Sequence, residues 1–193
     1  MTTFFTDCYT SPLGEMIIVI DECGALRALE WTDLTSRMVR LINRQYKGHS
    51  IRFEQAQAPP AIKIALDDYF GGTLRALDAL VTASGGTPFQ RSVWTALRAI
   101  PVGQVRSYRD IAIAVGNPKS VRAIGLANGA NPIGIVVPCH RVIGSNGTLT
   151  GYGGGLERKA WLLNHEGALP GRLMLATCSE SLARPPQFGK ADL

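Results

Sequence analysis

The chain has 193 residues, of which 46% are apolar and 18% charged, and this balance excludes disorder over the whole chain. The net charge is +5, and no aliphatic run is long enough to cross a bilayer. Four cysteines without a CxxC pair exclude a zinc ribbon, and an N-terminus without a signal-peptide pattern predicts a cytoplasmic protein with free thiols.

Residues 1–86 are predicted to form a small mixed α/β domain with a short antiparallel sheet. The expected elements are strands at 16–20 and 25–31, paired as a hairpin, and helices at 34–46 and 59–70. The Ala-Ser-Gly-Gly stretch at 83–86 predicts a linker that ends this domain. No chemistry is visible in these residues, so we expect the domain to provide support.

The charge is unevenly divided along the chain. Residues 1–86 carry 8 Lys and Arg against 10 Asp and Glu, whereas residues 87–168 carry 9 against 3. The basic second part indicates a polyanion as partner, although a merely basic surface explains the charge equally well. Residues 169–193 contain prolines and little periodicity, so we expect a flexible C-terminal tail. The predicted fold class is therefore α+β, with a mainly helical domain after the mixed one.

The helical domain is predicted to contain a helix-turn-helix. A capping box at 87–90 begins one helix, and Ser107 begins a short second helix. The Gly-Asn-Pro turn at 116–118 then separates the second helix from a third, expected at 118–128. Two short helices joined by a tight turn in a basic segment are typical of DNA-binding proteins, but also occur in proteins that never touch DNA.

The third helix has an unusual composition for a reader of the major groove. It carries small residues such as Ala123 and Gly125 beside one arginine, Arg122. Small side chains let a backbone approach another surface closely, as binding in the minor groove requires. Tight packing of this helix on a neighbouring helix is the competing interpretation.

Between this helix and the end of the domain, the chain alternates apolar and glycine-rich stretches. The apolar run 133–137, bracketed by two prolines, predicts a buried strand. The glycine-rich loop 151–155 matches neither the phosphate-loop nor the dinucleotide pattern, so it does not indicate a nucleotide site. A last helix is expected at 156–164.

Cys139 is the candidate nucleophile, because it ends the predicted strand and is followed at once by His140. A lone cysteine is usually a small buried apolar residue, so this assignment needs an activating base or positive charge. Neighbours on an extended strand point to opposite faces, which favours a water molecule between the sulfur and the imidazole.

Glu166 is the candidate that would orient His140. A carboxylate at a helix C-terminus opposes the helix dipole, at a cost of roughly 0.3–1 kcal/mol, and a cation facing it would explain that position. An exposed acid on a frayed helix end is an equally good interpretation.

The sequence resembles the O6-alkylguanine-DNA alkyltransferases, also called methylated-DNA–protein-cysteine methyltransferases. The resemblance is dense over residues 87–168 and looser at Ser11-Pro12-Leu13-Gly14. The matching motifs are Pro138-Cys139-His140-Arg141-Val142, Gly103-Gln104-Val105-Arg106-Ser107-Tyr108, Arg122-Ala123-Ile124-Gly125, Asn131-Pro132, Gly151-Tyr152-Gly153-Gly154-Gly155-Leu156 and Trp161-Leu162-Leu163-Asn164-His165-Glu166-Gly167.

The resemblance implies a set of catalytic roles. Cys139 would be the alkyl acceptor, and His140, through a water, would form with Glu166 the relay that produces the thiolate. Tyr108 would donate a proton toward the leaving guanine and would also lie near the DNA backbone. Asn131 would be the hinge between the recognition helix and the active-site strand.

The resemblance also implies how DNA would be bound. Arg122 would fill the gap left by a flipped-out nucleotide, on a helix whose small residues Ala123 and Gly125 face DNA. The guanine pocket would be lined by the backbone at Val142 and by Tyr152 and Gly153. Many relatives have serine at the position of Gly153, where a backbone N–H could still serve. Some relatives bind zinc, but the N-terminal half offers only His49 and no ligand set, so no metal and no other cofactor is expected.

The function implied is direct-reversal DNA repair by a protein that works once per molecule. An alkyl group would pass irreversibly from O6-alkylguanine in duplex DNA to Cys139, with O4-alkylthymine left open as a second substrate. A monomer without a membrane partner is expected. Two alternatives stay open: a helix-turn-helix protein that binds lesions or regulates transcription without chemistry, and, less well supported, a Cys-His hydrolase.

Overall fold

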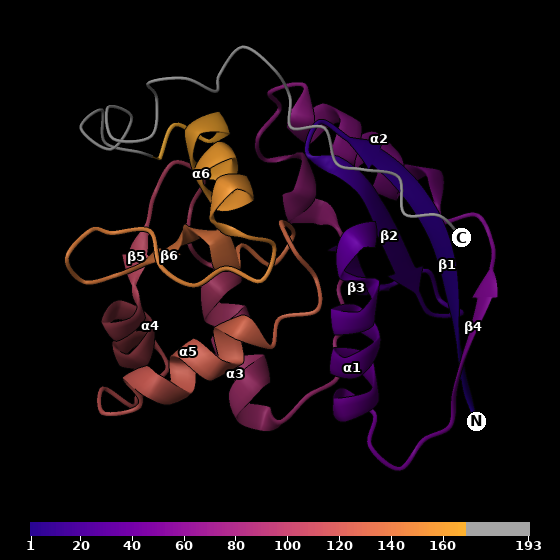
Figure 1. Ribbon diagram of the computed structural model, residues 1–193, viewed down its shortest axis with the longest axis horizontal. Helices are drawn as coiled ribbons and strands as arrows, with labels where there is room; N and C mark the ends of the chain where they lie inside the picture. The colour runs from indigo at the N-terminus through magenta and orange to yellow at the C-terminus, as the bar shows by residue number, and fades with distance from the viewer. Residues whose placement is uncertain (169–193) are drawn as a thin grey trace.

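The structure, a computed structural model, describes residues 1–168 (Figure 1). The tail predicted for 169–193 lies outside the described residues. Figure 1 shows the sheet with helices α1 and α2 on one side of the molecule and helices α3 to α6 gathered on the other. The predicted α+β class is confirmed.

The N-terminal part is built on a four-stranded sheet of order β3-β2-β1-β4. Its strands are β1 (Thr2–Ser11), β2 (Gly14–Ile20), β3 (Leu26–Trp31) and β4 (Ile51–Gln55). The predicted antiparallel hairpin is β2–β3, and β1 is also antiparallel to β2. The β4 strand, which the sequence did not indicate, pairs in parallel with β1. The sheet is thus antiparallel except at one edge.

Two helices cover the two faces of this sheet, as their apolar spacing requires. Helix α1 (Thr35–Gln45), preceded by the 3-10 turn η1 (Thr32–Leu34), packs Met38 and Ile42 on one face. Helix α2 (Pro60–Phe70) contributes Leu66 to the cluster on the opposite face and is followed by the 3-10 turn η2 (Ala76–Ala79). Both predicted helices are confirmed within one or two residues.

Residues 87–168 contain four α-helices and one pair of very short strands. These elements are α3 (Pro88–Arg98), β5 (Arg106–Ser107), α4 (Tyr108–Ala114), α5 (Val121–Gly129), the 3-10 turn η3 (Cys139–Arg141), β6 (Val142–Ile143) and α6 (Leu156–His165). Thr87 and Ser107 each cap a helix through a complete capping box. Helix α5 begins three residues later than predicted, because Asn117–Ser120 forms a hydrogen-bonded turn.

The buried strand predicted for residues 133–137 is wrong. Only Ile133 makes a β-bridge, to Leu29 of β3, and the chain then turns away. Ile135 has φ 64°, a left-handed conformation that is strained for a β-branched residue. Gly134 is needed here because a Cβ would lie 3.1 Å from the Leu29 carbonyl oxygen. The run is apolar because it is buried, and the bond from Gly134 N to the Leu29 carbonyl holds its bent backbone against β3.

The predicted domain boundary at residue 86 stays a prediction. One hydrophobic cluster contains sheet residues such as Met16 and Ile18 together with Val93 of α3 and Cys139. The two parts therefore share a core. No helix among residues 1–168 is long and apolar enough to span a membrane.

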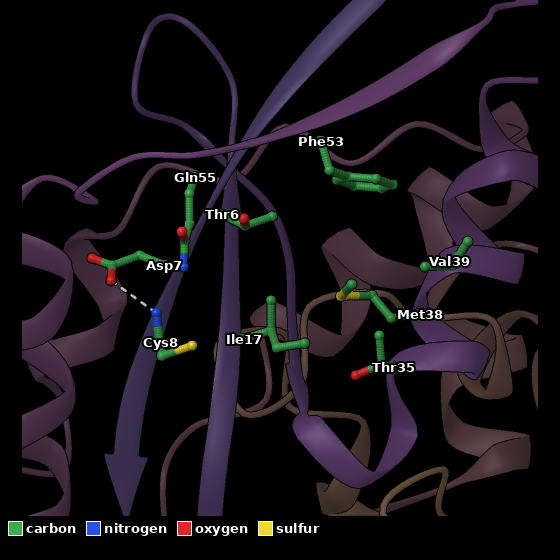
Figure 2. Close-up of a pocket in the computed structure, with 9 residues that line it drawn as sticks. All are labelled: Thr6, Asp7, Cys8, Ile17, Thr35, Met38, Val39, Phe53 and Gln55. Atoms are coloured by element: carbon green, nitrogen blue, oxygen red, sulfur yellow. Dashed lines mark hydrogen bonds between the residues drawn. The ribbon is translucent and has the colours of Figure 1, made fainter. Parts of the chain in front are cut away.

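An apolar pocket of about 260 Å³ lies on the α1 face of the sheet (Figure 2). Its lining includes Met38 and Val39 from α1 and Cys8, Ile17 and Phe53 from the strands. Cys139 belongs to the core cluster on the opposite face of the sheet. This pocket is therefore not part of the site around Cys139.

Candidate active site

Cys139 begins the 3-10 turn η3 and is 7% exposed. The Asn131 amide Nδ2 donates to its sulfur at 3.1 Å and to the Val137 carbonyl at 2.9 Å. Asn128, near the end of α5, donates from Nδ2 to the Cys139 carbonyl at 3.5 Å. The Cys139 sulfur is thus hydrogen-bonded to Asn131, which lies in the segment between α5 and η3. That Asn131 is a hinge stays a prediction.

The surroundings of the thiol act on its pKa in both directions. Burial raises the pKa of Cys139, and the hydrogen bond from Asn131 opposes that rise. Among the charged side chains, Glu30 raises the thiol pKa further while Arg37 and Lys159 lower it. Without substrate, the site holds a protonated thiol beside a donor that is placed to stabilise the thiolate.

His140 is completely buried and contacts Glu166. Its Nε2 lies 3.0 Å from Glu166 Oε1. Because Glu166 is 4% exposed at the end of α6, the interpretation of an exposed acid on a frayed end is wrong. A buried carboxylate with a histidine partner is the arrangement that selects one imidazole tautomer and stabilises an imidazolium.

Glu166 is held as an anion by four hydrogen bonds. Arg141 donates from Nε to Oε2 at 2.8 Å and from Nη2 to Oε1 at 2.9 Å. The Tyr69 hydroxyl donates to Oε1 at 2.8 Å, and His140 is the fourth partner. Burial alone would raise the pKa of Glu166, but the bonds from His140 and Arg141 hold it well below its ordinary value.

The other nitrogen of His140, Nδ1, is buried without a hydrogen-bond partner among residues 1–168. Burial lowers the pKa of His140, and the contact with Glu166 only partly opposes this, so the imidazole is neutral near pH 7. Cys139 and His140 both lie in a 3-10 turn, so the expectation that they point to opposite faces of an extended strand is wrong. With Nε2 engaged by Glu166, Nδ1 is the nitrogen available to accept a proton.

Lys159 and Tyr108 contact the loop that follows β6. The Lys159 side chain is buried and donates from Nζ to the carbonyls of Val142 and Thr150, both at 2.6 Å. Burial lowers the pKa of Lys159 to about 8. The Tyr108 hydroxyl lies 3.4 Å from the Gly151 carbonyl, and burial raises the pKa of Tyr108. A single ammonium group thus connects two of the predicted pocket segments.

The glycine-rich loop is packed against the N-terminal part of the chain. A Cβ at Gly153 would lie 2.5 Å from Arg37 Nη2, and one at Gly154 would lie 2.5 Å from the Trp31 ring. Arg37 forms an ion pair with the buried Glu30 and donates to the Gly129 carbonyl at 2.8 Å. The space that a serine would occupy at position 153 is therefore filled by a guanidinium group.

The exposed face of α5 carries the predicted DNA-binding residues. Arg122 is exposed in the first turn, and a Cβ at Gly125 would meet no atom within 4 Å. Leu126 is 72% exposed beside them. Helix packing therefore does not explain the small residue at 125, although Ala123 is half-buried. The helix faces that pack inward carry Ile124 and Ala127.

The comparisons with known proteins agree with this geometry. Residues 88–168 match the family model described as the 6-O-methylguanine DNA methyltransferase DNA binding domain. The chain is 55% identical over 159 residues to the methylated-DNA–protein-cysteine methyltransferase of Salmonella typhimurium, covering 82% of this chain and 93% of that protein. The chain belongs to the methylated-DNA–protein-cysteine methyltransferase family.

Solved structures agree with this membership. The O6-methylguanine methyltransferase of Mycobacterium tuberculosis has a TM-score of 0.69 and 37% identity, over 91% of this chain and 99% of that one. A structure of the OGT protein of the same organism in complex with DNA has a TM-score of 0.68 and 37% identity over the same shares. The similarity to methyltransferase structures thus extends through the N-terminal part as well.

Five residues that surround the site in the structure have no role predicted from the sequence. These are Tyr69 and Arg141 on Glu166, Lys159 on the pocket loops, and the Glu30–Arg37 pair at Gly153. Arg141 was within reach of prediction, because a second basic residue directly follows His140. Nothing in the local sequence of Tyr69 or Arg37 indicates a contact with residues about a hundred positions away.

Proposed function

We propose that this protein repairs O6-alkylguanine in duplex DNA by accepting the alkyl group on Cys139, once per molecule. The observation that carries the proposal is the buried Cys139 sulfur bonded to Asn131, directly followed by a histidine paired with a buried glutamate. The proposal includes action without a cofactor, as a monomer, in the cytoplasm. Relatives of this chain are named for transfer from methylated DNA to a protein cysteine.

The chemistry proposed is one displacement at carbon. Neutral His140 takes the proton of the Cys139 thiol at Nδ1, directly or through one water, and Glu166 stabilises the resulting imidazolium. The sulfur then attacks the alkyl carbon, an S–C bond forms, and the C–O6 bond breaks. The electron pair of the broken bond stays on the guanine, and the product thioether has no second nucleophile to remove the alkyl group.

Tyr108 is proposed as the acid for the leaving guanine. Its hydroxyl donates to the carbonyls of Thr150 at 3.5 Å and Gly151 at 3.4 Å, at the start of the loop proposed to line the guanine pocket. A raised pKa keeps this hydroxyl protonated and able to donate. Donation to guanine as negative charge develops would stabilise the transition state more than the ground state.

A base inside a duplex cannot present its alkyl carbon to a buried sulfur, so the damaged nucleotide must leave the stack. Arg122, exposed at the start of α5, is the residue proposed to fill the gap. The open backbone at Gly125 and the exposed apolar Leu126 suit contact with the minor groove, where apolar wedges are common. The flipped base would enter beside Val142, Tyr152 and Gly153.

The test is to incubate the reduced protein with a methylguanine duplex and to measure the intact mass of the protein. One added methylene per chain, with no further increase at excess DNA, supports the proposal. An unchanged mass with retained DNA binding would instead support a protein that binds lesions without chemistry. The hydrolase alternative has no observation that favours it over alkyl transfer, and the relatives of this chain are named for methyl transfer to a protein cysteine.

A further inference from the structure

The N-terminal part of the chain contributes one hydroxyl group to the glutamate beside the acceptor cysteine. Tyr69, in the last turn of α2, is fully buried, and its hydroxyl donates to Glu166 Oε1 at 2.8 Å. The two residues are separated by 97 positions in the chain. The same oxygen atom lies 3.0 Å from His140 Nε2. Tyr69 and His140 therefore share one acceptor atom.

The position of Tyr69 is fixed by two further contacts with α6. Its own carbonyl accepts a hydrogen bond from His165 Nε2 at 2.7 Å, and its ring meets the His165 ring edge-on at 5.2 Å. Phe70 also packs on the Tyr69 ring at 5.2 Å. The end of α2 is thus attached to the end of α6 through backbone and side chain, directly beside Glu166.

The hydroxyl differs in character from the other donors to Glu166. Arg141 brings a positive charge that offsets the carboxylate, whereas Tyr69 brings a neutral hydrogen bond. A neutral donor restrains the direction of Oε1 without removing the negative charge that faces His140. Burial beside Glu166 raises the pKa of Tyr69 far above its ordinary value, so the hydroxyl stays protonated.

We propose that Tyr69 is a positioning residue for alkyl transfer, through which the N-terminal part of the chain orients Glu166 and sets the basicity of His140. This inference rests on the proposed function of Cys139. It assigns the N-terminal part a role in the reaction beyond support. The role is exerted through Glu166 and His140, since the hydroxyl bonds to neither the sulfur nor a predicted pocket residue.

The test compares Tyr69→Phe with wild type in single-turnover methyl transfer from a methylguanine duplex across a range of pH. Without the hydroxyl, the orientation of Glu166 Oε1 is less restrained. The plateau rate should therefore fall on the order of tenfold, which is no more than the loss of one hydrogen bond to a charged group can cause. Oε1 also becomes a stronger acceptor for His140, which favours the imidazolium. The acidic limb of the profile should therefore move to higher pH, while affinity for undamaged DNA stays unchanged.

Tyr9→Phe is the matched control. The Tyr9 hydroxyl donates to a carboxylate on the same helix, Asp67 Oδ1, at 2.9 Å, and Tyr9 is 8% exposed. This variant also loses a hydrogen bond from a tyrosine hydroxyl to a carboxylate, but not to Glu166. The plateau rate and the acidic limb of its pH–rate profile should therefore match those of wild type. If Tyr69→Phe also matches wild type in both, while wild type is methylated, the inference is wrong and the proposed function stands. If the wild-type protein does not accept a methyl group, the proposed function itself is contradicted.

A second variant keeps the test decisive if Tyr69→Phe does not fold. Incorporation of 3-fluorotyrosine at position 69 preserves the shape and the hydroxyl but makes the hydroxyl a stronger donor. Oε1 would then accept less strongly from His140, and the acidic limb should move to lower pH. A limb at the wild-type position would overturn the proposal.

Discussion

Cys139 combines burial with a poised base, and this combination suits a nucleophile that is used once. Burial raises the pKa of the thiol, and thiols react with oxidants and adventitious alkylating agents mainly as thiolates. His140 Nδ1, the proposed proton acceptor, belongs to a neutral imidazole and has no hydrogen-bond partner in the described part of the chain. A protonated thiol reacts more slowly with such agents, and the proposed chemistry ionises it only for alkyl transfer.

Replacing Cys139 with serine should abolish alkyl transfer, because a hydroxyl is far harder to ionise beside a neutral imidazole. Affinity for a methylguanine duplex should stay within about twofold of wild type, since phosphate contacts provide most of the binding free energy. Gel-shift titration and intact mass after incubation measure the two quantities. Transfer that persisted in Cys139→Ser would show that another residue is the acceptor.

At the residue scale, the candidate site residues that could be predicted are those adjacent in the sequence or those at an energetically unfavourable position of a helix. Cys139 and His140 are adjacent, and Glu166 was noticed because an acid at a helix C-terminus is unfavourable. Tyr69 could not be found, because a tyrosine in an amphipathic helix is typical of any core. Its contact with Glu166 exists only once α2 is docked on α6.

Helix α5 presents an uncommon exposed surface, with one cation, open glycine backbone and an apolar side chain. The carbonyl of Gly129 in its last turn bonds to Arg37, and Asn128 bonds to the Cys139 carbonyl. Helix α5, which is proposed to face DNA, is therefore bonded near its C-terminal end to the turn that contains Cys139.

Arg122→Ala should slow transfer from a methylguanine duplex at least roughly tenfold, the equivalent of about 1.4 kcal/mol lost when the gap in the stack is unfilled. Reaction with free methylguanine base should be nearly unchanged, because no stack has to open. Arg44→Ala, which removes an equal charge from an exposed position of α1, is the control. Equal slowing of Arg122→Ala on both substrates would contradict the assignment.

At the element scale, the predicted helices with clear caps were confirmed, whereas the segment before Cys139 was not. Thr87 and Ser107 supply local hydrogen bonds that determine where α3 and α4 begin. Residues 133–137 are apolar because they are buried, and apolar residues alone do not distinguish a strand from a buried turn. Its bend depends on the approach of Gly134 to Leu29, a contact between distant parts of the chain.

At the scale of the whole molecule, the N-terminal part is joined to the candidate site by polar as well as apolar contacts. Arg158 of α6 forms an ion pair with Asp33 and lies over the Trp31 ring at 4.6 Å. Arg37 and Tyr69 reach the glycine-rich loop and Glu166 from α1 and α2. Charged and polar side chains of the N-terminal part therefore contact the candidate site directly. The uneven charge along the sequence did not predict these contacts.

These buried groups make stability depend on pH in a defined direction. The pKa of His140 is below 6.5 in the folded chain, so the unfolded chain binds the extra proton first and stability should fall as pH drops below 6.5. The pKa of Glu166 is also depressed, from an ordinary 4.5, so its contribution should be lost progressively below that pH. Urea unfolding between pH 8 and pH 3 measures the free energy of unfolding over both ranges.

Glu166→Gln provides the comparison for that measurement. This variant should be less stable at pH 7 and should lose less stability than wild type below pH 4.5, because the amide does not titrate. A wild-type unfolding free energy that stayed constant from pH 7 to pH 3 would contradict the burial and charge assigned to both groups.

The most direct test of the account is to locate the transferred carbon. After reaction with a duplex that carries a ¹³C-methyl group on guanine O6, peptide mass mapping should place one label on Cys139. The exposed Cys8 and Cys23 should carry none. A label on either exposed thiol, with Cys139 unmodified, would contradict the account.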